Sequence, residues 1–391
     1  MIPIAKPTIG ESELLAVARP LTSGWLTQGP EVAAFEQEFA AAVDAPYACA
    51  VSNCTTALHL ALRAVGVGAG DEVITASHSF IATANAIRYC GAIPVFVDVE
   101  PDTYNMDPRR IGALITARTR AILVVHQLGM PCNLQQMSAI ASRHGLPLIE
   151  DAACAAGSEI YWKGRWERIG RPHGLIACFS FHPRKIITTG DGGMLTTADA
   201  ELDRKFRLWR QHSMSLSDTA RHNAKDVQFE QYTELGFNYR MTDVQAAIGR
   251  AQLARLPGII EQRRKLAKKY DDLLSRIDGL GLPAEPAWAR SNWQSYCVRL
   301  PRHVSQVDIM RAMLHDGIAT RRGVMCSHRE PAYQTEPWRS EEGDGALAVS
   351  EALTSHAVIL PLYVGMTEDD QARVVSALAS ALDHQLRYAS R

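Results

Sequence analysis

One lysine, Lys185, stands in the segment SFHPRKIITTGDGGML, between an apolar run and a glycine-rich turn. Lysine is seldom fully buried, so a solvated turn residue is the ordinary interpretation. The alternative is an amine that forms a Schiff base with a carbonyl cofactor. Ser180, five residues earlier, could contact a phosphate, and Gly190, Gly192 and Gly193 permit a tight turn into the next strand. On this stretch alone the solvated lysine is favoured.

Asp151 and the segment 51–66 offer complementary chemistry. Asp151 ends the apolar run LPLIED, at the strand edge where open α/β sheets bind ligands. A carboxylate there can keep a ring nitrogen protonated, although it could equally cap the next helix. The segment VSNCTTALHLALRAVG opens a helical pattern with small polar residues, and a helix start suits a phosphate. The alternative is an ordinary N-cap by Ser52, Asn53 or Thr55.

A fourth element is the segment ELGFNYRMTDVQAAIG, in which Asn238 and Arg240 precede a helix capped by Thr242 or Asp243. Alone, it indicates a structural loop. Together the four elements supply a phosphate cradle, a ring-nitrogen carboxylate and a Schiff-base lysine, in the order found in pyridoxal phosphate enzymes. Their chance co-occurrence in one chain is much rarer than any single match.

Alternating strands and helices must position these residues. Short apolar runs predict strands at 72–77, 93–99, 120–127, 146–153, 175–181 and 193–197. Helical spacing of apolar residues lies between them, at 82–91, 108–116 and 134–145. This alternation predicts an α/β domain with a mostly parallel sheet covered by helices.

The remaining third of the chain predicts a smaller α+β domain. A helical region at 241–277 should break or kink at Pro257 and Gly258. Beyond it lie a strand candidate and two helices, at 293–300, 305–317 and 367–387. We predict a large domain at 1–255 and a small C-terminal domain at 256–391. The polar loops 212–236 and 334–345 are typical of lids or disordered segments.

Composition excludes several classes of protein. Of 391 residues 47% are hydrophobic, which predicts a large core, and the net charge of −1 gives no bulk attraction for nucleic acid. No signal peptide and no apolar run of ~18 residues are evident, so we expect a cytoplasmic protein with no membrane partner. The eight cysteines form no C-x-x-C pair, which indicates reduced thiols, and no motif suggests a metal.

Ordered sequence blocks across nearly the whole chain resemble sugar aminotransferases of the DegT/StrS family. The blocks are LTSGWLTQGPEVAAFEQEFA, SNCTTALHLAL, GDEVITASHSFIATANAI, GAIPVFVDVEPDTYNMD, IEDAACAAG, SFHPRKIITTGDGGM, GFNYRMTDVQAAIG and HREPAY. The resemblance implies pyridoxal 5′-phosphate as cofactor and the aspartate-aminotransferase fold (fold type I). That fold has a seven-stranded, mostly parallel sheet, and its active sites are shared within a homodimer.

The resemblance also implies roles for individual residues at the cofactor. Lys185 would form the Schiff base and Asp151 would pair with the pyridine nitrogen. Phe80 matches an aromatic residue that stacks on the cofactor ring. The residues matching phosphate ligands are Thr55, Thr56 and Ser180.

Two further positions, Asn238 and Cys154, would face the cofactor, and two others, His328 and Tyr333, would lie near the substrate. Asn238 would reach the cofactor phosphate of the neighbouring subunit. His328 and Tyr333 match an H-x-x-P-x-Y block near the substrate. Cys154 departs from the pattern, because family members often carry His, Gln or Glu there. A thiol is a weak hydrogen-bond partner, so local electronics or substrate fit could differ.

The implied reaction is a ping-pong transfer of an amino group from L-glutamate to a nucleotide-linked keto-sugar, such as a 4-keto-6-deoxyhexose. Arg321 and Arg322 could clamp a diphosphate, or could be ordinary surface arginines. A keto-cyclitol is the main competing acceptor. Relatives that dehydrate sugars can carry histidine at the lysine position, so Lys185 favours transamination over dehydration or epimerisation. A non-enzymatic regulator of the same fold would need a DNA-binding module, for which this chain has no basic stretch.

Overall fold

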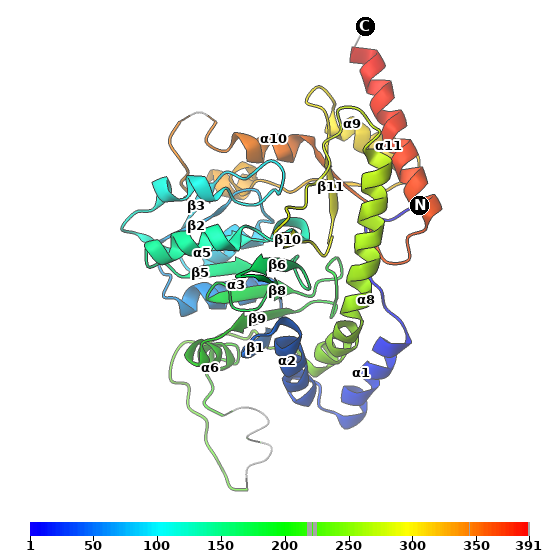
Figure 1. The fold of residues 1–391 in the computed structure, drawn as a ribbon. Helices are drawn as coiled ribbons and strands as arrows, with labels where there is room; N and C mark the ends of the chain where they lie inside the picture. Colours follow the sequence, from blue (N-terminus) through cyan, green and yellow to red (C-terminus); the bar gives the residue numbers. More distant parts are fainter. Residues whose placement is uncertain (217–220, 222–224, 344, 390–391) are drawn as a thin grey trace.

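The computed structural model describes residues 1–216, 221, 225–343 and 345–389, and a seven-stranded sheet lies at its centre (Figure 1). The strand order is β1-β9-β8-β5-β4-β2-β3, and only β9 runs antiparallel to its neighbours. The seven strands are β1 (Tyr47–Val51), β2 (Glu72–Ala76), β3 (Ile93–Val97), β4 (Thr119–Val125), β5 (Leu148–Asp151), β8 (Ile176–Ser180) and β9 (Gly193–Thr197). The predicted mostly parallel sheet is therefore confirmed, with seven strands as the family resemblance implied.

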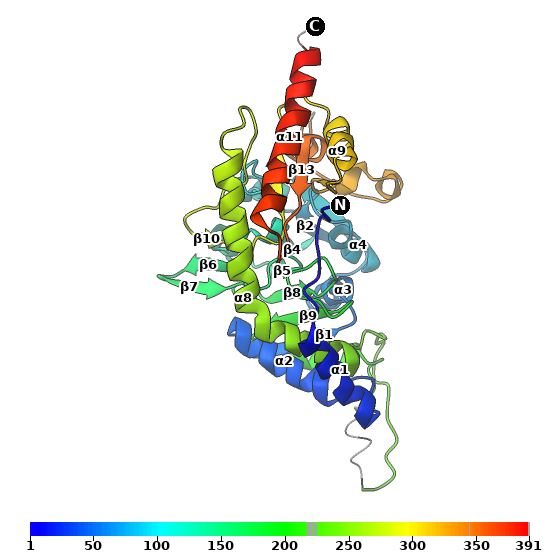
Figure 2. The same ribbon diagram turned by 90° about the vertical axis from the view of Figure 1, so that its right-hand side faces the viewer.

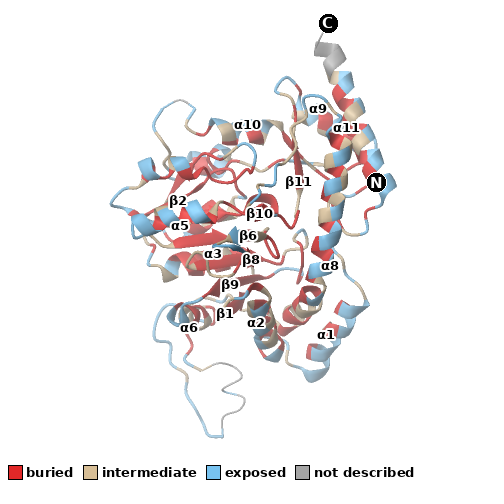
Figure 3. Cartoon of the chain, viewed as in Figure 1, coloured by how far each residue is buried: buried red, intermediate tan, exposed pale blue. Residues whose placement is uncertain are grey.

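Both faces of the sheet are covered, which is why its strands are buried and mostly apolar (Figure 3). One face packs with α3 (Cys54–Ala64), α4 (Ala82–Tyr89) and α6 (Ala200–Trp209). The opposite face packs with α2 (Pro30–Val43), α5 (Leu134–Arg143) and α8 (Asp243–Leu274). Successive strand residues alternate between the two cores: Ile149 joins the α3 side and Leu148 the α2 side.

Helix α8 is the longest element and begins at a capping box. The Thr242 hydroxyl accepts from the Gln245 backbone N–H, and the Gln245 side chain reaches back to the backbone of Thr242. The predicted break at Pro257 does not occur, because the helix continues through this residue to Leu274. It changes direction along its length instead, as Figures 1 and 2 show, and Pro257 removes one backbone hydrogen bond inside it.

A second hydrophobic core lies around a three-stranded sheet of order β11-β13-β12. Its elements are β11 (Tyr296–Arg299), β12 (Arg321–Arg322), β13 (Ala357–Leu360), α9 (Gln306–His315) and α11 (Glu368–Ala389). Ile2, from the start of the chain, also packs in this core, as do residues from the C-terminal half of α8. The domain division at residue 255 stays a prediction, because α8 runs across it.

The structure differs from the sequence-based expectation at four places. The predicted helix at 108–116 is two 3-10 turns, Pro108–Arg110 and Gly112–Leu114, because proline and glycine interrupt the pattern. Strand β1 and the hairpin β6 (Glu159–Trp162)–β7 (Arg165–Arg168) were not predicted. Loop 334–343 is not a free lid, because Arg339 pairs with Val95 at the edge of β3 and forms an ion pair with Glu72.

The loop 212–236 is only partly described, since 217–220 and 222–224 lie outside the described residues. Residues 225–235 extend away from the body of the molecule (Figures 1 and 2). The remaining elements are α1 (Glu11–Ser23), β10 (Ala289–Arg290), α10 (Ala348–His356) and the 3-10 turns Gln127–Gly129, Ser327–Arg329 and Pro331–Gln334. Within the described residues, no helix has the length and apolar character needed to cross a bilayer.

Candidate active site

The chain order of β5 and β8 brings Asp151 and Ser180 to the same side of the sheet. Each is the last residue of its strand. Ile149 and Cys178, two residues earlier, pack in the core beneath α3, so the alternation of strand side chains places Asp151 and Ser180 on the α3 side. The carboxyl ends of parallel strands form the ligand-binding edge of such sheets. The predicted carboxylate and hydroxyl therefore meet at one edge.

Lys185 reaches this edge from the loop between β8 and β9. Its side chain is half-buried, and its Nζ donates to the Cys154 Sγ at 3.1 Å. Burial alone would lower the pKa of Lys185, but Cys154 and the Asp151 carboxylate favour the charged amine and raise the pKa above its ordinary value. The predicted amine is therefore partnered by Cys154 and lies close enough to Asp151 to be stabilised by its charge, unlike a freely solvated turn lysine.

Asp151 is a buried carboxylate, and the hydrogen-bond donors it has among the described residues are neutral. Its Oδ2 accepts from the Thr83 hydroxyl at 2.7 Å, and its Oδ1 accepts from the Ala153 backbone N–H at 3.1 Å. The Thr83 hydroxyl lies 2.7 Å from that of Ser79. Burial raises the pKa of Asp151, and these two hydrogen bonds, together with the charge of Lys185, only partly offset that effect.

The neighbouring residue Glu150 faces the other side of the sheet and is fully buried. Its carboxylate accepts from the Gly174 backbone N–H at 2.8 Å and lies 3.0 Å from Nε2 of His126. His126 Nδ1 accepts from the Cys132 backbone N–H at 3.1 Å, so the ring proton is on Nε2 and points at Glu150. Both oxygens of Glu150 are therefore occupied by the protein itself.

The start of α3 lies beside the end of β8. Cys54 Sγ donates to the Cys178 carbonyl at 3.6 Å, and a Cβ on Gly193 would lie 2.4 Å from the Asn53 carbonyl oxygen. Gly193 is the register partner of Ser180, so this close approach brings the helix start and Ser180 together. Only glycine permits it.

The cap of α3 is Asn53, whose side chain accepts from the Thr56 backbone N–H at 2.9 Å. The Thr56 hydroxyl donates to the Asn53 carbonyl at 2.7 Å and is engaged in the cap. Thr55 is half-buried beside it. The two predicted threonines and Ser180 thus form one group at a positive helix end.

Phe80 and Asn238 are both exposed. The Phe80 side chain is 62% exposed, and the Asn238 side chain accepts from Arg240 at 3.3 Å. Their predicted contacts, one with a cofactor ring and one with a second subunit, stay predictions.

His328 and Tyr333 are buried, and their polar atoms are hydrogen-bonded within the protein. His328 lies between Ser77 and Glu351, with Nδ1 2.6 Å from the Ser77 hydroxyl and Nε2 3.0 Å from the Glu351 carboxylate. The Tyr333 hydroxyl donates to Asn85 at 3.0 Å, and its ring packs against Phe96. In this structure both residues fasten the 3-10 segment 327–334 to the large sheet. Their contact with a substrate stays a prediction.

Arg321 and Arg322 form the short strand β12 and are exposed. The Arg322 guanidinium pairs with Glu330 at 2.9 Å, and its side chain is 53% exposed. Both arginines belong to the three-stranded sheet β11-β13-β12, in which they pair with Ile359 and Val358 of β13. A role in binding a diphosphate stays a prediction.

Sequence reasoning missed Thr83 and Ser79. Both lie in the block SHSFIATANAI, but Ser79 precedes the helix α4, which begins at Ala82. The sequence pattern gave no indication that the two hydroxyls would meet, and only the folded chain brings them within 2.7 Å of each other. In the described part of the chain, no group of three or more His, Cys, Asp or Glu side chains could hold a metal ion.

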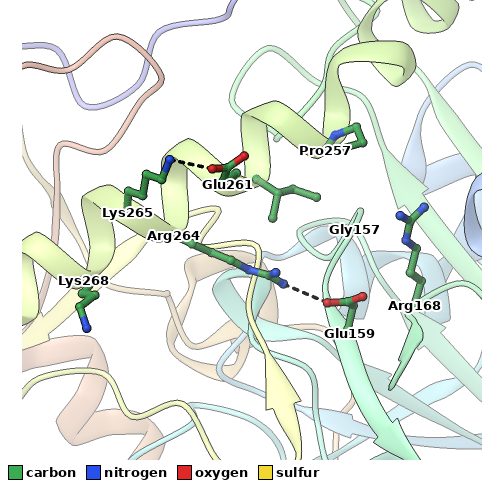
Figure 4. Close-up of a pocket in the computed structure, with 9 residues that line it drawn as sticks. Gly157, Glu159, Arg168, Pro257, Glu261, Arg264, Lys265 and Lys268 are labelled. Atoms are coloured by element: carbon green, nitrogen blue, oxygen red, sulfur yellow. Dashed lines mark hydrogen bonds and ion pairs between the residues drawn. The ribbon is translucent and has the colours of Figure 1, made fainter. Parts of the chain in front are cut away.

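A cavity of about 400 Å³ lies elsewhere, between α8 and the β6–β7 hairpin (Figure 4). None of the predicted site residues lines it. We call it the α8 cleft; its charged lining residues are Glu159, Arg168, Glu261, Arg264, Lys265 and Lys268.

Comparison with known proteins agrees with this geometry. The chain is 37% identical to the spore coat polysaccharide biosynthesis protein SpsC of Bacillus subtilis (strain 168), over 96% of each chain. The crystal structure of the aminotransferase TlmJ from Streptoalloteichus hindustanus matches with a TM-score of 0.88 and 34% identity, over 99% of this chain and 100% of that one. DesV of S. venezuelae, solved in complex with a ketimine intermediate, matches with a TM-score of 0.86 and 32% identity, over 98% of each chain.

Fold and comparisons together define the class of protein: it is an aminotransferase of fold type I. Residues 7–379 match the DegT/DnrJ/EryC1/StrS aminotransferase family, and the chain belongs to this family. The resemblance inferred from the sequence blocks is therefore confirmed.

Proposed function

We propose that this enzyme is a pyridoxal 5′-phosphate-dependent sugar aminotransferase. The observation that carries the proposal is the meeting of Lys185, Asp151 and the start of α3 at one edge of the sheet. These groups match the three parts of the cofactor: an amine for its carbonyl, a carboxylate for its ring nitrogen, and a helix N-terminus for its phosphate. When bound, the cofactor supplies an electron-withdrawing ring that stabilises a carbanion on the substrate.

The buried carboxylate of Asp151 suits a cationic partner. Its neighbours Thr83 and Ala153 donate hydrogen bonds that fix its orientation but supply no positive charge. We propose that Asp151 holds a proton on the ring nitrogen, which would supply that charge. Thr55, Thr56 and Ser180 would hold the phosphate, and Phe80 would cover the ring.

Lys185 would carry two functions. Its amine would hold the carbonyl of the cofactor and, when free, would move a proton to and from the reacting carbon of the substrate. Its position beside Cys154 keeps it near Asp151 in either role.

The proposed substrates are L-glutamate as donor and a nucleotide-linked keto-sugar as acceptor, such as a 4-keto-6-deoxyhexose. The relation to a polysaccharide biosynthesis protein supports a sugar. Arg321 and Arg322 would bind the diphosphate, with His328 and Tyr333 near the sugar. We further propose a homodimer in which Asn238 reaches the partner subunit's site. Its exposure supports this, as do the exposed apolar residues of the nearby loop, Val227, Phe229 and Leu235.

The experiment is a spectroscopic titration of the purified enzyme with pyridoxal phosphate and then L-glutamate. We expect a visible Schiff-base band that glutamate removes, with one 2-oxoglutarate released per site. A keto-sugar nucleotide should restore the band. A band that glutamate leaves unchanged would contradict the donor, and binding without a Schiff-base band would contradict the role of Lys185. Restoration by a keto-cyclitol alone, or dehydration without consumption of glutamate, would favour the two alternative reactions.

A further inference from the structure

Cys154 differs from the other cysteines of the chain. All eight lie within the described residues, and seven are buried, whereas Cys154 is half-exposed. Burial raises the pKa of each of those seven thiols, to about 12 for Cys49, Cys90 and Cys297 and to about 11 for Cys326. Buried thiols with a raised pKa are poor nucleophiles. Cys154 is therefore the thiol that a small oxidant reaches.

The atom next to the Cys154 sulfur is a second nucleophile. Lys185 Nζ lies 3.1 Å from Sγ, on a flexible four-carbon side chain, and Lys185 is itself half-buried rather than sealed. Cys154 also lies three residues beyond Asp151, which the end of β5 fixes in place. The two reactive atoms thus come from separate parts of the fold, the turn after β5 and the loop between β8 and β9, and lie in hydrogen-bond contact.

We propose that Cys154 and Lys185 form an oxidant-sensitive modification site, in which a hydroperoxide links the two side chains by a sulfur–nitrogen bond. The Cys154 thiolate attacks hydrogen peroxide and the O–O bond breaks, which forms the sulfenic acid, and the leaving hydroxide takes a proton from the Lys185 ammonium group and becomes water. The neutral Lys185 amine then attacks the sulfur, the S–O bond breaks, and the hydroxyl leaves with a proton of the amine as a second water. Sulfur loses two electrons, which the peroxide receives.

The link would switch the enzyme off reversibly. Two equivalents of an external thiol break it: the first takes the sulfur and frees Lys185, and the second releases Cys154. The chemistry of the link needs no cofactor. Its effect on turnover rests on the proposed role of Lys185, because an amine bonded to sulfur cannot bind a carbonyl. A bound cofactor should for the same reason protect the pair.

The test is mass spectrometry of the full chain, freed of cofactor, treated with hydrogen peroxide, quenched with catalase and digested without reductant. We expect a pair of joined peptides, containing Cys154 and Lys185, two hydrogens lighter than their sum. Dithiothreitol should separate them, and prior loading with pyridoxal phosphate should reduce their yield severalfold.

Two variants serve as controls. Cys154→Ser should abolish the joined peptides, whereas Cys54→Ser, which alters a buried thiol near the same lysine, should leave them unchanged. Oxidation of Cys154 to sulfinic acid with a separate Lys185 peptide would overturn the proposal, as would an unmodified Cys154. Because the readout is a mass, it holds even if Lys185 has no part in catalysis, so the two proposals fail independently.

Discussion

Charged side chains cluster in two regions of this molecule, and the two clusters differ in their exposure and in their bonding partners. In the α8 cleft, Lys265 pairs with Glu261 at 2.6 Å, with 73% and 66% of their side chains exposed, and Arg264 lies 3.4 Å from Glu159 (Figure 4). At the sheet edge, Asp151 is 5% exposed and receives hydrogen bonds from two neutral donors, the Thr83 hydroxyl and the Ala153 backbone N–H.

This difference distinguishes charged side chains that are merely exposed on the surface from those that are candidates for a function. Exposed ion pairs are solvated, so keeping them costs little and losing them matters little. A buried carboxylate without a directly bonded cation is costly, and burial accordingly raises the pKa of Asp151. Groups held at such a cost are candidates for binding and catalysis. The four predictions below test this contrast, from the largest expected effect to the smallest.

Lys185→Ala should give the largest effect. It removes the amine proposed to move the proton, so we expect turnover to fall at least about 1,000-fold, or ~4 kcal/mol of transition-state stabilisation. Steady-state kinetics and an unchanged far-UV circular dichroism spectrum would establish this. Turnover near the wild-type rate would show that the sheet-edge amine is not catalytic.

Thr83→Val should give a smaller loss. The variant keeps the shape of the side chain but removes the hydroxyl bonded to Asp151, so the carboxylate is less well oriented and its pKa rises further. We expect a turnover loss of about 10-fold, ~1.4 kcal/mol, and a weaker cofactor affinity. Thr83→Ser is the matched control and should recover most of both. Equal losses in the two variants would indicate that packing, not the hydrogen bond, matters at this position.

Asp151→Asn should raise the stability of the cofactor-free protein. The folded pKa of Asp151 lies above its ordinary value of 3.8, so its ionisation opposes folding once the pH exceeds 3.8. The melting temperature of the variant should therefore exceed that of the wild type at neutral pH. The gain should shrink as the pH falls toward 3.8. In the variant, the Thr83 hydroxyl can rotate to accept from the new amide. A rise in melting temperature that does not change with pH would show that the ionisation of Asp151 is not its cause.

Lys265→Ala should give the smallest effect. The lysine and its partner Glu261 are exposed on α8, where water replaces the lost ion pair. We expect no measurable change in melting temperature or turnover, which thermal unfolding and kinetics would check. A marked loss of activity would mean that the α8 cleft contributes to function, and the contrast between the two regions would fail.

Much of the fold could be predicted because buried parallel strands leave long apolar runs. Six of the seven strands of the large sheet were predicted in this way. Strand β1 was missed because its sequence, YACAV, contains two alanines and a cysteine, which have little strand preference. Its pairing with β9 depends on residues about 146 positions later, which no local pattern records.

The candidate site was predictable only in part. For Lys185 and Asp151, the residue types themselves, an amine and a carboxylate, indicate the chemistry that they could perform. Thr83 gives no such indication, since a threonine in a helical segment is common, and only the folded chain shows its hydroxyl 2.7 Å from Asp151. For His328 and Tyr333 the limit is the opposite one. A sequence motif picked out both residues, but no sequence pattern indicates the internal hydrogen bonds that the structure shows for them.

The hydrogen bonds that Gly174 and His126 donate to Glu150 limit which sequence changes β5 can accept. Adjacent residues on a strand face opposite ways, so a slip of β5 by one position would exchange Glu150 and Asp151 between core and crevice. The bonds from Gly174 and His126 fit a glutamate in one register only. The buried pair of Glu150 and His126 therefore fixes the register of β5. A single-residue insertion within β5 should destabilise the protein far more than any substitution at the surface of the strand.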